Sequence, residues 1–157
     1  YSMALVEEQI HSRTDKCLIP AAAFLEELAQ SVSTAFPEIH SNIELVHNSE
    51  LPALRPETAI PLGLIISELV TNSMKHGFKN RRSGLVLIRC SYDKGMYGIT
   101  VSDDGCGSDS GKNPDGIGLV LLRVLAVQLF ARLGLKSDEG WLVSLSFPYI
   151  ADEPVCL

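Results

Sequence analysis

Four polar side chains with the chemistry of a phosphate site recur at helical spacing between residues 60 and 78 (IPLGLIISELVTNSMKHGF). They are Glu68, Asn72, Lys75 and His76, at positions i, i+4, i+7 and i+8. A helix turns about 100° per residue, so this spacing gathers them on one face. A carboxylate and an amide one turn apart can hold a hydrated Mg²⁺ against phosphate groups, because Mg²⁺ prefers oxygen ligands. An ordinary solvated helix face has the same pattern, so this stretch alone leaves both interpretations open.

A second motif, DDGCG, occupies residues 103–107 directly after a predicted strand. A carboxylate at a strand end, such as that of Asp103, can accept a hydrogen bond from an exocyclic amine. The glycines beside it, Gly105 and Gly107, allow a flat ring to approach the backbone. An Asp-Gly turn without any ligand is the plainer interpretation of this motif.

A third motif, DGIGL at residues 115–119, opens a predicted helix. Backbone N–H groups at a helix N-terminus attract anions, and Gly116 and Gly118 remove side-chain bulk there. A flexible loop that simply ends at a helix has the same composition. The P-loop pattern G-x-x-x-x-G-K-[ST] does not occur in the chain.

The elements that must position these motifs follow from apolar periodicity. Apolar residues recur at helical spacing on another face of the central stretch, which predicts a helix from about residue 58 to residue 77 packed on a core. Helices are also predicted at residues 3–11, 20–36 and 118–133. Short alternating runs predict strands, which are residues 43–47, 85–92 and 96–102 and two strands around a turn at 138–140.

The resulting order is helix, strand, helix, two strands, loop, helix, two strands. Strands joined by tight turns form an antiparallel or mixed sheet, and the helices must then cover one of its faces. The sequence therefore predicts an α/β two-layer sandwich, with a mixed, mostly antiparallel sheet covered on one face by about three helices.

Composition is typical of one globular domain. The 157 residues are 46% apolar and 20% charged, with a formal net charge of −6. No basic stripe predicts a nucleic-acid surface, and no apolar run reaches the ~18 residues of a membrane span. The four cysteines form no C-x-x-C pair, so a zinc site is not expected, and scattered thiols favour a reducing, cytoplasmic setting.

In this order and spacing, the three motifs together are specific. ELVTNSMKH (68–76), DDGCG (103–107) and GIGL (116–119) resemble the N box and the two glycine boxes of the GHKL, or Bergerat-fold, ATP-binding superfamily. The chain is most similar to the catalytic domain of sensor histidine kinases, in the HWE-like branch with a short nucleotide lid. The resemblance covers residues 21–149 and implies ATP and Mg²⁺ as ligands.

The resemblance implies a role for each matching residue. Asn72 matches the Mg²⁺ ligand, and Glu68 matches the residue that helps to activate the attacking group. Lys75 and His76 match positions near the phosphates and the sugar, and Asp103 matches the aspartate that bonds the 6-amino group of adenine. Residues expected to flank the ring or cradle the phosphates are Gly105, Gly107, Gly116, Gly118 and Leu119. Residues 108–115 are expected to form the lid.

The implied activity is that of a two-component sensor histidine kinase, a transferase that moves the γ-phosphate of ATP to a histidine. None of the four histidines of the chain lies in a phosphoacceptor motif on a long dimerising helix; they are His11, His40, His47 and His76. The chain also does not begin with Met, so the acceptor is expected upstream of Tyr1. A fragment without it is not expected to phosphorylate anything alone.

The expected organisation has three parts. Residues 1–12 would be the remnant of an upstream dimerisation helix, residues 13–150 the ATP-binding catalytic domain, and residues 151–157 a tail. The expected partners are the dimerisation and phosphoacceptor domain, a response regulator receiver domain and, in the full-length protein, a second copy. The parent protein could be soluble or membrane-anchored.

Two other functions fit the same boxes. An anti-sigma-factor-type serine kinase shares them, and a degenerate, non-catalytic nucleotide-binding module would act by protein contact alone. The helical pattern near the N-terminus favours the histidine kinase, and the presence of Glu68, Asn72, Asp103 and the glycines disfavours degeneracy. A topoisomerase or chaperone-type ATPase is disfavoured by the short lid and by the lack of room for a transducer domain.

Overall fold

The computed structural model describes residues 18–36, 40–47, 50–78, 83–107, 117–137 and 140–150. The predicted helix at residues 3–11 and the predicted lid at 108–115 lie outside these residues. The described elements are the helices α2 (Ala21–Thr34), α3 (Pro56–Asn72) and α4 (Ile117–Gln128), the π-helical turn η1 (Ser73–Gly77), and the strands β1 (His40–His47), β2 (Ser83–Asp93), β3 (Met96–Asp103), β4 (Arg132–Lys136) and β5 (Leu142–Pro148).

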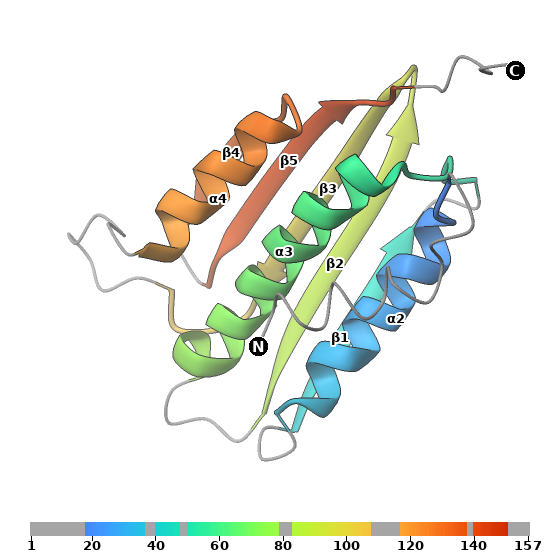
Figure 1. Ribbon diagram of the computed structural model, residues 1–157. Helices are drawn as coiled ribbons and strands as arrows, with labels where there is room; N and C mark the ends of the chain where they lie inside the picture. The colour runs from blue at the N-terminus through green and yellow to red at the C-terminus, as the bar shows by residue number, and fades with distance from the viewer. Residues whose placement is uncertain are drawn as a thin grey trace, which may run out of the picture.

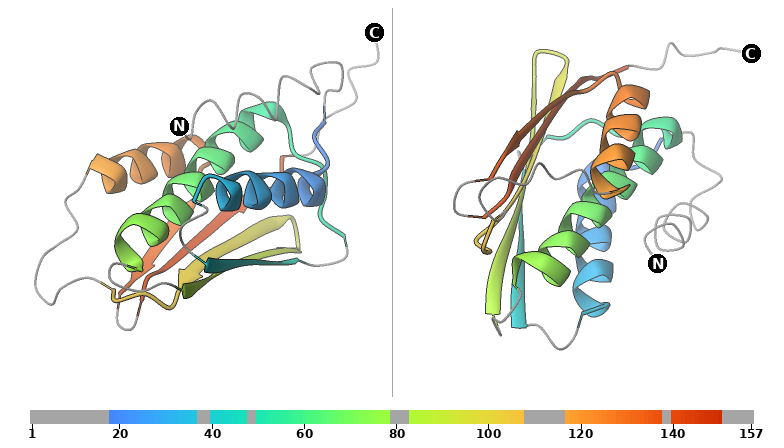
Figure 2. Two further views of the ribbon diagram at one scale, coloured as in Figure 1. Left: turned by 90° about the horizontal axis from the view of Figure 1, so that it is seen from below. Right: turned by 90° about the vertical axis from the view of Figure 1, so that its left-hand side faces the viewer.

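The five strands form one sheet in the order β1-β2-β3-β5-β4. β1 runs parallel to β2, and every other pair is antiparallel. The three helices lie side by side on one face of the sheet, with α3 between α2 and α4 (Figures 1 and 2). The predicted two-layer sandwich with a mixed, mostly antiparallel sheet is therefore confirmed.

The core lies between the helices and the sheet, and its pattern explains how an acidic group comes to face inward. Along β3, Tyr97, Ile99 and Val101 are buried, because alternate residues of a strand point to the same face. Asp103 continues this row and is 9% exposed. The apolar stripe of α3 covers the centre of the sheet, and its fully buried members include Leu62, Ile65, Ile66 and Val70.

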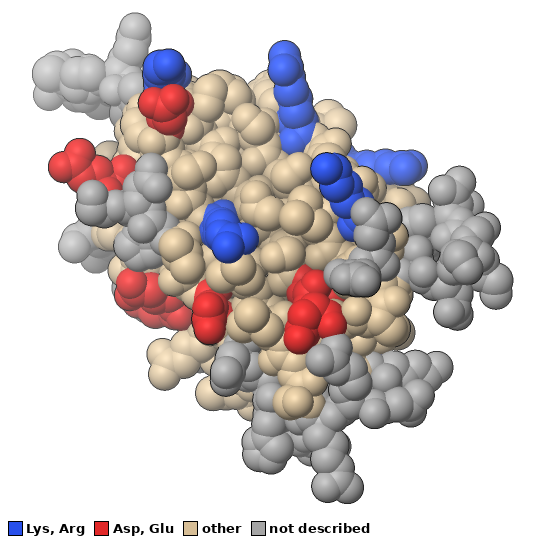
Figure 3. Space-filling model, turned by 180° about the vertical axis from the view of Figure 1, so that it is seen from behind, with Lys and Arg blue, Asp and Glu red and all other residues tan. Residues whose placement is uncertain are grey.

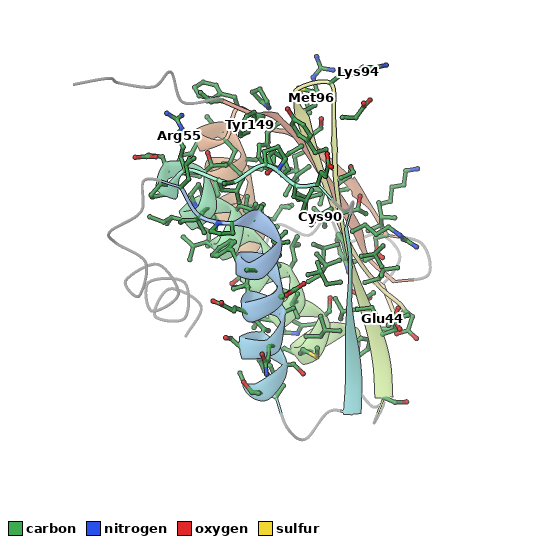
Figure 4. All side chains as sticks on the ribbon, turned by 90° about the vertical axis from the view of Figure 1, so that its right-hand side faces the viewer. Glu44, Arg55, Cys90, Lys94, Met96 and Tyr149 are labelled. Atoms are coloured by element: carbon green, nitrogen blue, oxygen red, sulfur yellow. The ribbon has the colours of Figure 1, made fainter. Side chains whose placement is uncertain are left out.

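None of the described helices lies on the other face of the sheet. On this face the basic side chains of the described residues lie mainly in the upper half of the view, and the acidic ones lie mainly along its left side and lower part (Figure 3). Lys94 and Gly95 close the hairpin between β2 and β3 with positive φ angles of 48° and 77°, which is a type I′ turn. Lys94 and Met96 mark the end of this predicted hairpin in Figure 4.

The last helix is shorter than the sequence predicted. The expected helix continued to residue 133, whereas α4 ends at Gln128 and β4 begins at Arg132. The Ala131 N–H donates to the Ala126 carbonyl (2.8 Å) and the Phe130 N–H donates to the Val127 carbonyl (3.0 Å). Together with a φ of 52° at Phe130, these bonds form a Schellman C-cap. The sequence does not indicate this helix end, because the left-handed C-cap position holds phenylalanine where glycine is usual.

One side of α4 presents apolar side chains to solvent. Val120, Val124 and Val127 are 58%, 52% and 73% exposed, and Phe130 beyond the helix end is 76% exposed. Their spacing of three or four residues gives a continuous stripe. Among the described helices, none is both long and apolar enough to cross a lipid bilayer.

Candidate active site

A cavity of about 450 Å³ opens between α3, the start of α4 and the ends of β3 and β5. Its apolar wall comes from both layers of the fold and consists of Leu69, Val101, Leu119, Leu122, Leu135 and Val143. Its polar side chains are Glu68, Asn72, Ser73, His76 and Asp103. An apolar chamber with a few convergent polar groups is the common form of a small-molecule site.

Most of the predicted site residues line this one cavity. They are Glu68, Asn72, His76, Asp103, Gly107, Gly118 and Leu119. These residues come from three separate sequence motifs, so the fold unites the motifs at one place. Gly116 lies outside the described residues, and so does the segment expected to form the lid.

Lys75 does not line the cavity, although His76 beside it does. The cause is η1, in which the Phe78 N–H donates to the Ser73 carbonyl five residues back (3.1 Å). A π turn contains more residues than an α turn, so His76 comes under Asn72 and Lys75 turns outward to solvent. The α-helical spacing used in the sequence prediction assumed that α3 continued without change to residue 77.

The Asp103 carboxylate is held by three donors. Its Oδ2 accepts from the Ser73 hydroxyl (2.5 Å), and its Oδ1 accepts from the backbone N–H groups of Gly105 (2.9 Å) and Trp141 (3.3 Å). The Ser73 hydroxyl also lies 3.1 Å from the Leu69 carbonyl, but its one hydrogen favours the charged acceptor. The buried carboxylate is therefore fixed in place as an acceptor at the cavity wall.

Tight backbone packing requires glycine beside this carboxylate. A Cβ at Gly105 would lie 2.6 Å from the Gly77 carbonyl oxygen, and one at Gly140 would lie 2.0 Å from the Asp103 carbonyl oxygen. Gly140 also has a φ of +91°. The Cys106 N–H donates to the Gly77 carbonyl (3.0 Å), which ties the second motif to the end of η1. Gly105 thus packs against Gly77, donates its N–H to Asp103 and does not itself line the cavity.

Glu68 and Asn72 face the first turn of α4. A Cβ at Gly118 would lie 3.0 Å from Oε1 of Glu68 and 3.4 Å from Nδ2 of Asn72, so glycine leaves room beside both groups. Among the described residues, no three His, Cys, Asp or Glu side chains gather to hold a metal ion. One amide oxygen and one carboxylate fit Mg²⁺ that takes its other ligands from phosphates and water.

Among the polar and aromatic side chains that line the cavity, sequence reasoning missed Ser73 and Trp141. Ser73 lies outside the helical spacing of the first motif, and nothing in the sequence shows that it reaches Asp103 across 30 positions. Trp141 was interpreted only as part of the closing strand. The pairing of the closing strand with β3 was the signal that could have identified it, because this pairing sets Trp141 opposite Asp103.

Comparisons with known proteins extend over the whole fold. The profile of the family described as histidine kinase-like ATPase domain matches residues 16–146. Blue-light-activated histidine kinase 2 of Erythrobacter litoralis is 31% identical over 151 residues, which are 89% of this chain and 43% of that protein. The solved histidine kinase domain of a blue-light-activated histidine kinase from Erythrobacter litoralis matches with a TM-score of 0.80 at 26% identity. That match covers 94% of this chain and 73% of the solved one.

A shorter match concerns a second class of protein. Anti-sigma F factor of Halalkalibacterium halodurans is 40% identical, but over only 43 residues, which are 27% of this chain and 30% of that protein. The chain spans less than half the length of these curated relatives. The similarity to histidine kinases includes all the elements around the cavity, whereas the similarity to the anti-sigma factor is partial.

Proposed function

The chain belongs to the histidine kinase-like ATPase domain family, and from this premise we propose that it is the catalytic domain of a two-component sensor histidine kinase. In this role it holds ATP and transfers the γ-phosphate to a histidine on a dimerisation domain upstream in the full-length protein. A response regulator receiver domain then takes the phosphate. The full-length protein acts as a homodimer, with this domain in the cytoplasm, where ATP is available.

One observation carries the proposal: Asn72, Asp103 and Gly118, each from a different motif, line the same cavity. Asp103 can accept from the 6-amino group of adenine, because a carboxylate has about four acceptor sites and the three protein donors leave one of them open. The triphosphate then extends toward Asn72 and the first turn of α4, where backbone N–H groups favour negative charge.

The chemistry at the γ-phosphate is mainly positioning and charge neutralisation. Mg²⁺ held by the Asn72 amide oxygen would neutralise the phosphate oxygens. Glu68 lies one turn before Asn72 and can accept the N–H proton of the incoming imidazole, which makes the other ring nitrogen a better nucleophile. His76 contributes a polar contact at the cavity edge, and Lys75 at the surface adds positive charge near the phosphates.

Phosphate chemistry tests this function. Full-length protein incubated with Mg²⁺ and ATP labelled at the γ-phosphate is expected to gain label that acid removes and alkali does not, as for a phosphohistidine. Asn72→Ala is expected to abolish this labelling while the chain still binds ADP by calorimetry. Labelling of Asn72→Ala at the wild-type rate would refute the assigned role of the amide.

The anti-sigma-factor alternative is tested in the same assay. A serine kinase of that type would leave acid-stable label on a partner protein. The match to the anti-sigma factor covers only 27% of the chain, so it supports this candidate less than the longer matches support the histidine kinase. Absence of heat with both ATP and ADP would refute both kinase assignments.

A further inference from the structure

Trp141 is the single tryptophan of the chain, and its side chain has no role in the chemistry described so far. It lies just before β5 and lines the cavity. The Asp103 N–H donates to the Trp141 carbonyl (2.9 Å), which continues the register of β3 and β5 by one pair beyond Ser102 and Leu142. Trp141 is thus the direct cross-strand neighbour of Asp103.

The register fixes the side to which the indole points. Opposite residues on antiparallel strands direct their side chains to the same face of the sheet. Val101 and Val143 are such a pair, and both are buried under the helices. The next pair on that face is Asp103 with Trp141, so both side chains stand on the cavity side.

The backbone of Trp141, and not its side chain, makes the contacts with Asp103. Its N–H reaches Oδ1 at 3.3 Å, and its carbonyl accepts from the Asp103 N–H. Any residue other than proline would supply these two groups. The indole is half-buried and is left to interact with whatever occupies the cavity.

We propose that Trp141 contacts the purine base directly and forms the aromatic wall of the base subsite. The inference rests on the proposed nucleotide function of the cavity. The aromatic surface and the fixed acceptor lie side by side, so each would recognise a different part of the base. Asp103 selects the exocyclic amine, and Trp141 binds the ring system through stacking, which is strong for any purine. Trp141 therefore gives preference for two-ring over one-ring bases without distinguishing adenine from hypoxanthine.

Calorimetry with ADP and IDP on three forms of the chain tests this division. Trp141→Leu keeps apolar bulk but removes the aromatic face, and it is expected to weaken ADP and IDP by a similar factor, on the order of 10-fold or more. Trp141→Phe retains a smaller aromatic face and is expected to stay within a few-fold of wild type. Asp103→Asn is the comparison variant, and it should lose far more affinity for ADP than for IDP.

A second measurement needs no variant and holds even if Trp141→Leu does not fold. Because the chain has one tryptophan, its fluorescence reports this position alone. Saturating ADP is expected to reduce the quenching of this fluorescence by acrylamide, since a stacked base covers the indole.

The outcomes separate the two proposals. Wild type that binds ADP without any change in acrylamide quenching would overturn the role of Trp141 and leave the nucleotide function standing. A folded Trp141→Leu variant with wild-type affinity for ADP would do the same. Wild type that binds no adenine nucleotide would overturn both.

Discussion

At the scale of single residues, one buried carboxylate organises the cavity. Asp103 is placed by its strand, oriented by Ser73 and two backbone N–H groups, and packed against glycines that permit no Cβ. Few of these contacts depend on residues near it in sequence. The carboxylate is therefore in place before any ligand arrives, which reduces the ordering cost of binding.

Replacement of Asp103 by Asn is expected to weaken ADP by roughly 10- to 100-fold, because a hydrogen bond to a charged group contributes about 1.5–3 kcal/mol. The introduced amide can turn an N–H₂ toward a carbonyl at the 6-position, so IDP should lose less affinity than ADP. Calorimetry with both nucleotides measures the difference. Equal losses would show that Asp103 does not read the 6-position.

Replacement of Ser73 by Ala is expected to lower the free energy of unfolding by about 1–2 kcal/mol, because a buried carboxylate loses one of its three donors. Urea denaturation measures this change. Ser67 provides a matched control in α3, about two turns before Ser73. Ser67 is 1% exposed, and its hydroxyl has no hydrogen-bond partner among the described residues. Ser67→Ala should be neutral or slightly stabilising, and an equal cost for both variants would contradict the role given to Ser73.

Residue types alone predicted part of this site. Glu68, Asn72 and His76 were found from helical spacing, and Asp103 and Gly118 from glycine motifs, but their grouping came from resemblance. Ser73 and Trp141 required knowledge of which strands pair. The outward turn of Lys75 required the π turn, which has no signature in the spacing. The roles of all these residues in catalysis stay predictions.

At the scale of secondary-structure elements, the end of α4 shows how packing overrides a local pattern. Phe130 adopts a left-handed φ of 52°, which costs a non-glycine residue about 1–2 kcal/mol. The apolar run predicted a continuous helix, yet β4 must begin at Arg132 to pair with β5. Sheet pairing therefore fixes the end of the helix.

Replacement of Phe130 by Gly is expected to raise the free energy of unfolding by about 1 kcal/mol. Glycine removes the left-handed strain, its own entropy cost offsets part of the gain, and a side chain that is 76% exposed contributes little packing. Thermal unfolding should show a midpoint about 2–4 °C higher. Phe130→Ala removes the ring and keeps the strain, so a similar gain in that control would rule out this explanation.

The central strands carry two buried acidic groups that remain neutral in the folded state. Burial raises the pKa of the Cys90 thiol from 9.0 to about 12, and burial also raises the pKa of the Tyr97 hydroxyl, with smaller contributions from Tyr149, Tyr92 and Cys90. Cys90 lies between the strands and the helices in Figure 4. When the pKa of an acid is higher in the folded state than in the unfolded state, its contribution to the free energy of unfolding is fully present below the unfolded pKa. This contribution is lost as the pH rises above that value.

The free energy of unfolding is therefore expected to fall above pH 9. For Cys90 the linked loss between pH 8 and pH 10 is on the order of 1 kcal/mol, because the unfolded thiol ionises and the buried one does not. Urea denaturation at the two pH values measures the loss. The Cys90→Ala variant should lose about that much less than wild type, and an identical decline in both would exclude Cys90 as the source.

At the scale of the whole molecule, the cavity joins elements that are distant in sequence. Its walls come from α3, η1, α4 and the strands β3, β4 and β5, so it exists only when both layers are assembled. The sequence predicted the element order and the sandwich because periodicity and turns are local. It predicted a mixed, mostly antiparallel sheet but did not say which strands pair in parallel, because β1 and β2 are separated in sequence by α3. The strand order, with β5 between β3 and β4, has the same non-local origin.

Because the cavity depends on the complete fold, a nucleotide that fills it should stabilise the whole domain. ADP at 100 times its dissociation constant is expected to raise the free energy of unfolding by about 2.7 kcal/mol, provided that it binds only the folded chain. Denaturant titration with and without ADP measures the shift. Asp103→Asn at the same ADP concentration should show a much smaller shift, and an equal shift would indicate binding elsewhere.

The exposed apolar side chains along α4 have a practical consequence for measurements of unfolding. Environment-sensitive dyes such as ANS fluoresce when they leave water for an apolar surface, and Val120, Val124, Val127 and Phe130 offer one on the native protein. Dye-based melting curves should start from a high baseline and understate the transition. Circular dichroism, or the emission of the one indole, will follow unfolding more faithfully.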